Sequence, residues 1–188
     1  MKLIVGLGNP TKDYSNTRHN LGANTLIELA MFFDNQDNWQ NFDNLGKITD
    51  IKVKDETIKL FLPGSFMNLS GEPIKKVMSF YKIAITDLWV IHDELDLPLG
   101  SVRLSFSSTS AGHNGVQNII DALGGNNFWR WRLGVGRPTD SIPGHKFVLL
   151  PFSKDEIKTF SEFVSTAANK IKIAIEIGAE NFVNKFNQ

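Results

Sequence analysis

Apolar residues in the first third of the chain follow two spacings, one typical of strands and one typical of helices. The run Lys2–Leu7 predicts a buried first strand, and the apolar positions of Asn20–Phe33 fall on one face of a helix. Ile48–Val53 and Ile58–Leu62 both have strand character. Only Lys54–Thr57 separates these two runs, which predicts a hairpin.

The rest of the chain continues the alternation of strands and helices. Strands are expected at Leu88–Ile91, in the centre of a sheet, and at Ser101–Phe106 and Trp129–Gly136. Helical spacing is found at Ile74, Val77, Met78 and Tyr81, and another helix is expected over 115–123. Near the end of the chain, the capping-box pattern Ser153-x-x-Glu156 predicts the start of a helix. A second, buried helical segment is expected from the spacing of Ile171, Ile173, Ala174 and Ile177. The polar stretch Asp34–Asn44 is expected to be a surface loop.

This order of elements predicts the class of fold. Strands that alternate with helices, together with one hairpin, favour an α/β/α sandwich with a mixed, mostly parallel central sheet. A length of 188 residues favours one domain, residues 1–188, with enough apolar surface for a core.

Composition narrows the classes of function. Hydrophobic residues make up 41% of the chain and charged residues 21%, which is ordinary for a soluble protein. We expect no signal peptide and no membrane span. The absence of cysteine excludes disulfides and fits a reducing cytoplasm. Because the net charge is zero, binding to nucleic acid would require a local basic patch.

The loop from Gly6 to Asn20 allows three interpretations. A dinucleotide site is disfavoured, because Thr11 stands where a third glycine is needed and Pro10 removes an N–H from the turn. A metal site in His92–Asp96 has suitable donor types, but its spacing is wrong and neighbouring strand residues point in opposite directions. The third interpretation is hydrolysis by a histidine base.

Topology gives this third interpretation a physical basis. Asn9 follows the first strand and Asp93 follows Leu88–Ile91, so parallel strands would bring both residues to one edge of the sheet. His19 precedes a helix, and His113 and Asn114 begin another. A carboxylate beside His19 would fix its tautomer, while amides could hold a water molecule and an oxyanion. A metal-dependent esterase or peptidase and an RNA-binding module that has lost catalysis stay open as alternatives.

Six motifs then identify a family that the chain resembles. In order, they are KLIVGLGNP, YSNTRHNLG, FMNLSG, HDELDLPLG, AGHNG and RLGVGRP, and they span residues 2–138. Together they resemble the bacterial-type peptidyl-tRNA hydrolases. The resemblance implies hydrolysis of the ester between a peptide and the 3′-terminal ribose of tRNA, which recycles tRNA from stalled translation. It also implies a single α/β domain that is a monomer, with no metal and no organic cofactor, and the expected location is the cytoplasm.

The resemblance also assigns roles to individual residues. His19 matches the catalytic base and Asp93 its carboxylate partner. The amides that position water and substrate and stabilise the oxyanion match Asn9, Asn68 and Asn114, and the residues that contact the tRNA 3′ end or line the peptide groove match Tyr14, Phe66 and Met67, with His113 as a second site histidine.

Recognition of the tRNA acceptor end is implied by basic residues near the sheet edge. Arg103 and Arg132 match two phosphate-binding positions, whereas Ser105 and Gln117 stand where cations are common. We therefore expect fewer ionic contacts to tRNA. Two further interpretations stay open: Arg130 and Arg137 compensate, or Arg130 is an exposed charge on an edge strand; and the hydroxyls of Ser107–Gly112 bind phosphate, or that loop is only stiffer.

Overall fold

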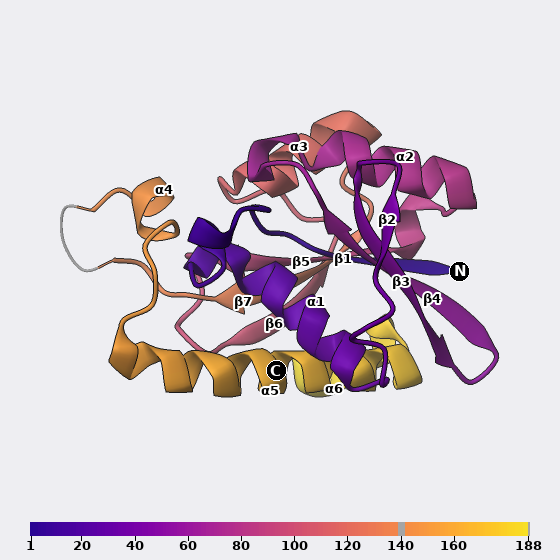
Figure 1. Cartoon of the computed structure of the whole chain (residues 1–188). Helices are drawn as coiled ribbons and strands as arrows, with labels where there is room; N and C mark the ends of the chain where they lie inside the picture. Colours follow the sequence, from indigo (N-terminus) through magenta and orange to yellow (C-terminus); the bar gives the residue numbers. More distant parts are fainter. Residues whose placement is uncertain (139–141, 188) are drawn as a thin grey trace.

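The computed structural model describes residues 1–138 and 142–187, which form one seven-stranded sheet with helices on both faces (Figure 1). The strand order is β2-β3-β4-β1-β5-β7-β6. The strands are β1 (Lys2–Gly6), β2 (Gln40–Phe42), β3 (Gly46–Val53), β4 (Glu56–Pro63), β5 (Leu88–Glu94), β6 (Val102–Phe106) and β7 (Trp129–Gly134). The four central strands are parallel, and antiparallel pairs flank them, so the predicted mixed α/β sandwich is confirmed.

Two layers of helices cover the sheet (Figure 1). One layer is α2 (Gly71–Tyr81) with α3 (Asn114–Leu123), and the other is α1 (Leu21–Met31) with α5 (Lys154–Ile177) and α6 (Ala179–Phe186). Strand side chains alternate between the two cores: in β1, Ile4 packs toward α1 and α5, whereas Leu3 and Val5 pack toward α2. The short elements are α4 (Gly144–Phe147), η1 (Lys12–Tyr14), η2 (Arg18–Asn20), η3 (Met67–Leu69) and η4 (Ile85–Asp87).

Two expectations about elements were wrong. The stretch Asp34–Asn44 is not only a loop, because β2 lies within it and pairs antiparallel with β3. This edge strand has exposed polar residues and no apolar alternation that a pattern could detect. The segment Ile171–Ile177 is not a separate helix, since α5 continues without a break from the capping box at Ser153 to Ile177.

The edge strand β6 receives a side chain in place of a neighbouring strand: Asn187 accepts a hydrogen bond from the Leu104 N–H at 3.2 Å and donates one to the Leu104 carbonyl.

Among the described residues, no helix is long and apolar enough to cross a membrane.

Candidate active site

The carboxyl ends of the parallel strands meet at one edge of the sheet, where they position the candidate residues. Asp93 lies inside β5 rather than just beyond it, because β5 extends to Glu94. His19 lies in η2, immediately before α1, and His113 is the N-cap of α3. Residues far apart in the sequence are thereby brought to one place, as the topology predicted.

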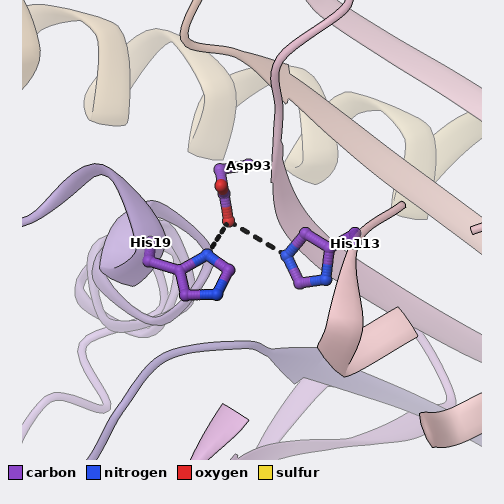
Figure 2. Close-up of side chains that lie close together, drawn as sticks. All are labelled: His19, Asp93 and His113. Carbon is purple, nitrogen blue, oxygen red and sulfur yellow. Dashed lines mark hydrogen bonds and ion pairs between the residues drawn. The ribbon is translucent and has the colours of Figure 1, made fainter. Parts of the chain in front are cut away.

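Both histidines contact the same carboxylate oxygen (Figure 2). The distance from Asp93 Oδ1 is 2.9 Å to Nδ1 of His19 and 3.0 Å to Nε2 of His113. The three side chains are nearly enclosed, with exposed fractions of 11% for His19, 7% for His113 and 3% for Asp93. A hydrogen bond in such a site is stronger than in water, so the rings are firmly oriented.

The remaining contacts of the rings distinguish the two histidines. The backbone N–H of Val116 donates to His113 Nδ1 at 3.2 Å, which leaves Nε2 of His113 to carry the proton shared with Asp93. Both nitrogens of His113 are therefore engaged. His19 donates from Nδ1 to Asp93, and its Nε2 keeps a lone pair beside the cleft that His19 lines.

Burial and charge act in opposite directions on these groups. Burial lowers the pKa of His19, but the charge and the hydrogen bond of Asp93 raise it, and the net pKa lies above the ordinary histidine value. Burial raises the pKa of Asp93, yet His19 and His113 together hold it well below the usual carboxyl range. Asp93 is therefore a fixed anion near neutral pH.

A cavity of about 490 Å³ opens next to these side chains. The predicted residues that line it are Asn9, His19, Phe66, Met67, Asn68, Asp93, His113 and Asn114. Phe66 is 49% exposed, whereas Met67 is 4% exposed. The cavity thus combines amides and imidazoles with an apolar side, which fits a polar reacting bond attached to an apolar group.

The amide of Asn9 has a fixed orientation. Its Oδ1 accepts the N–H of Met67 at 2.9 Å, so its NH₂ group is the part that can donate to a ligand. Asn20 holds the backbone of Asn9 on both sides, accepting its N–H at 2.8 Å and donating to its carbonyl at 3.0 Å. Sequence reasoning missed Asn20, and its place in the same loop as His19 was the available signal.

Other lining residues were not predicted as site residues. Glu94, Leu95 and Asp96 follow Asp93, and Gly144, His145, Val148 and Leu149 come from the α4 region. The α4 contribution could not be inferred from spacing, since it depends on how a distant loop packs. Arg137 also lines the cavity and pairs with Asp96 at 3.0 Å.

Three of the predicted substrate-binding residues lie outside the cavity lining. Tyr14 is half-buried in η1. Arg103 and Arg132 are cross-strand neighbours on β6 and β7, and Arg132 donates to Glu94 at 2.9 Å. Ser105 is the cross-strand neighbour of Arg130, and Gln117 binds Asp121 on the surface of α3 at 2.8 Å.

One of the two open interpretations of Arg130, an exposed charge on an edge strand, is wrong. β7 lies between β5 and β6, and Arg130 is only 1% exposed, with a guanidinium that donates to the Ser108 hydroxyl. Burial and the charge of Arg132 lower the pKa of Arg130 to about 10. Two loop hydroxyls also have partners within the chain: the Ser108 hydroxyl is 3.2 Å from that of Ser105, and the exposed Ser107 hydroxyl donates to Asn127 at 3.0 Å.

The dinucleotide and metal interpretations of the sequence can be compared with this geometry. A Cβ on Gly6 would come within 2.6 Å of the Gly22 carbonyl, so the glycines near β1 permit close packing of α1. Among the described residues, the group whose donor atoms lie within 4.8 Å is His19, Asp93 and His113, and not His92–Asp96. His92 is buried and directs Nδ1 at the backbone carbonyl of Asp93.

Comparison with known proteins places the chain in a family. A family model described as peptidyl-tRNA hydrolase matches residues 3–188. Proteins named peptidyl-tRNA hydrolase are 40% identical over 188 residues in Geobacillus kaustophilus (strain HTA426) and 37% identical over 190 residues in Desulfitobacterium hafniense (strain Y51), each covering 100% of both chains. The crystal structure of peptidyl-tRNA hydrolase from Acinetobacter baumannii superposes with a TM-score of 0.86 at 30% identity, covering 98% of this chain and 93% of that one. The chain therefore belongs to the peptidyl-tRNA hydrolase family of enzymes.

Proposed function

We propose that this enzyme hydrolyses the ester bond of peptidyl-tRNA, with His19 as general base and without a metal ion. The single observation that carries the mechanism is the difference between the two histidines: within residues 1–138 and 142–187, both ring nitrogens of His113 have partners, whereas Nε2 of His19 has none and can accept a proton. The expected substrate is an N-acylated aminoacyl-tRNA, and the products are a free peptide and a tRNA that can be used again in translation. Residues 1–188 act as one hydrolase domain in this proposal.

The first chemical step is attack by water. Nε2 of His19 accepts a proton from a water molecule as the water oxygen bonds to the ester carbonyl carbon. Asp93 stabilises the imidazolium that forms and stays ionised. The NH₂ group of Asn9 supports this step, because its own oxygen is occupied by Met67 and it can only donate to the water oxygen.

The second step is collapse of the tetrahedral intermediate. Asn114 and Asn68 reach the cavity from different elements and supply N–H donors to the oxyanion, a contribution of roughly 3 kcal/mol for one well-placed donor. The carbon–oxygen bond to the terminal ribose breaks, and the His19 imidazolium returns its proton to the ribose oxygen. Water is thereby divided between the peptide carboxyl group and the tRNA hydroxyl group.

Turnover of an N-blocked aminoacyl-tRNA tests this mechanism. His19→Ala and Asp93→Asn should each lower kcat/KM by about 10²- to 10⁴-fold, the range typical of a lost general base. Asp55→Asn is the control, because Asp55 is exposed in the turn between β3 and β4 and does not line the cavity. Near-normal rates in both site variants would contradict the mechanism.

The absence of a metal requirement needs its own measurement. His19, Asp93 and His113 have the donor types of a metal site, but the N–O distances of 2.9 and 3.0 Å suit shared protons. Activity should survive dialysis against a chelator. Loss of activity that is restored by added metal would favour a metal-dependent esterase. Binding of peptidyl-tRNA without any hydrolysis would favour a binding module.

A further inference from the structure

Arg18, the residue before the candidate base, has a buried guanidinium that the proposed chemistry does not use. Arg18 is only 6% exposed. Its guanidinium carbon lies 4.3 Å from the centre of the Phe147 ring and 4.5 Å from the centre of the Phe152 ring. Each contact is within the range of a cation–π interaction, and such contacts strengthen when desolvated.

The same guanidinium reaches the beginning of α5. Its Nη2 donates to Oε1 of Glu156 at 2.6 Å. The other oxygen of Glu156 accepts the backbone N–H of Ser153 at 2.8 Å, as part of the capping box of α5. Glu156 therefore connects the first turn of a long helix to Arg18. We call Arg18, Phe147, Phe152 and Glu156 the Arg18 cluster.

The two aromatic rings belong to a segment that forms one side of the cleft. We call residues 144–152 the α4 wall; it extends away from the sheet in Figure 1, and its residues Gly144, His145, Val148 and Leu149 line the cavity. Backbone contacts attach this wall to the loop that carries His19. The Phe152 N–H donates to the Asn16 carbonyl at 3.1 Å, and the His19 N–H donates to the Val148 carbonyl at 2.9 Å.

We propose that Arg18 is a positioning residue that holds the α4 wall against the His19 loop and thereby sets the affinity of the cleft for the acyl part of the substrate. The proposal rests on the proposed function, because it assigns the wall to that substrate. Only arginine combines a planar face for two rings with a fork of donors for a carboxylate. A methionine could fill the space between the rings but could not bind Glu156.

Three variants and one matched control test this role. Arg18→Met removes the charge, Arg18→Lys keeps a cation without the planar fork, and Glu156→Gln keeps the capping box while weakening the ion pair. Lys59→Met is the control: Lys59 is also buried, pairs with Asp50 at 2.7 Å and lies 4.2 Å from the Tyr81 ring centre, on strand β4 away from the cavity lining. Steady-state kinetics on an N-blocked aminoacyl-tRNA and amide hydrogen exchange are measured for each.

The expected result separates positioning from simple stabilisation. Arg18→Met should raise KM by about tenfold, with a smaller change in kcat, because a displaced wall weakens binding and orientation. The apparent pKa of the pH–rate profile should not move, since the contact between His19 and Asp93 is intact. Exchange at residues 144–152 should accelerate, and Arg18→Lys should restore part of the loss. Lys59→Met should lower Tm without changing KM or this exchange.

Two outcomes would overturn the proposal. One is an unchanged KM in Arg18→Met with a loss of Tm like that of Lys59→Met, which would make Arg18 a structural residue only. If Arg18→Met does not fold, unchanged KM and exchange in both Arg18→Lys and Glu156→Gln overturn it as well. If the wild-type protein shows no turnover, the proposed function fails, and unchanged exchange at 144–152 in the Arg18 variants would separately refute the contact between wall and loop.

Discussion

At the scale of single residues, the candidate site depends on how two histidines share one carboxylate oxygen of Asp93. Asp93 accepts from His19 and from His113, and it is buried by the strands and loops around it. The histidines differ because α3 uses the second nitrogen of His113 for its N-cap, whereas the second nitrogen of His19 is left beside the cavity. A helix cap thus decides which imidazole can act as a base.

The pH dependence of turnover should follow His19. A general base must be neutral, and Asp93 holds the pKa of His19 above the ordinary value of about 6.5. The apparent pKa of the acid limb of the kcat/KM profile should therefore lie above that value. In Asp93→Asn it should move to lower pH, because burial then lowers the pKa of His19 without the opposing charge of Asp93. A pH–rate profile checks this, and a limb that stays in place in the variant would assign the titration to another group.

His92 should make the fold sensitive to acid. Burial, His113 and Arg130 lower the pKa of His92 well below its ordinary value, so it is neutral in the folded state and gains a proton on unfolding below about pH 6.5. Stability from this group is present above that pH and is lost as pH falls, by about 1.4 kcal/mol per pH unit. Urea unfolding across pH 4.5–8 measures the slope. In His92→Gln, the slope of the unfolding free energy against pH should decrease by the amount that one bound proton contributes. An equal slope in both proteins would exclude His92 as the source of the pH dependence.

The sequence indicated which polar residues would come together at one edge of the sheet, but it did not indicate what surrounds them. His19, Asp93, Asn9, Asn68 and Asn114 were chosen by residue type and motif, and all of them line one cavity. The α4 contribution and the role of Asn20 were not predicted, because they depend on packing between loops. The burial of Arg130 was not predicted either, since a charged residue in a strand gives no sign of which strands lie beside it.

At the scale of elements, the approach of α1 to the sheet determines where His19 lies. A Cβ on Gly22 would overlap the carbonyl oxygen of Ile91 and would come within 2.8 Å of the carbonyl of Leu7. Glycine at this position lets the first turn of α1 contact the backbone of β5. Since His19 lies in the turn that precedes α1, the same contact brings its ring to Asp93.

Gly22→Ala should therefore affect both stability and activity. Overpacking against backbone atoms should lower the free energy of unfolding by about 1–3 kcal/mol. The shift of α1 should also reduce kcat beyond any unfolded fraction, because the base moves relative to Asp93. Denaturant unfolding and kinetics on the same samples check this. Gly125→Ala is the control, as its nearest neighbour would lie 4.0 Å away; normal kcat in Gly22→Ala would refute the link.

Regular elements could be predicted and irregular ones could not. β1, the β3–β4 hairpin and α3 have clear periodicity, and the structure contains them close to the expected bounds. β2 has no such pattern, because both of its faces are polar or partly exposed and its pairing with β3 determines its conformation. The continuity of α5 was not predicted, because its first half is mostly exposed or partly buried, whereas one face of its second half, with Ala167, Ala168, Ile171 and Ala174, is buried.

At the scale of the whole molecule, a neutral protein must bind a polyanion through a local set of charges. Arg103 is exposed on the edge strand β6, next to Arg132, whose Nε binds Glu94. Arg103→Gln should weaken tRNA binding and reduce the slope of log K against log salt by roughly 0.7 to 0.9. Lys52→Gln on β3, toward the other edge of the sheet, should change neither. A salt titration of tRNA binding measures these slopes. Equal slopes in the wild type, Arg103→Gln and Lys52→Gln would show that Arg103 does not contact the tRNA.

The paired amide contacts of Asn187 with Leu104 have a consequence for handling the protein at high concentration. An unprotected outer strand offers its backbone to another copy and can seed intermolecular sheets. Asn187 imitates a neighbouring peptide unit and blocks that position on β6. Asn187→Ala should therefore be more prone to concentration-dependent self-association, which light scattering would detect, while dilute samples keep normal turnover.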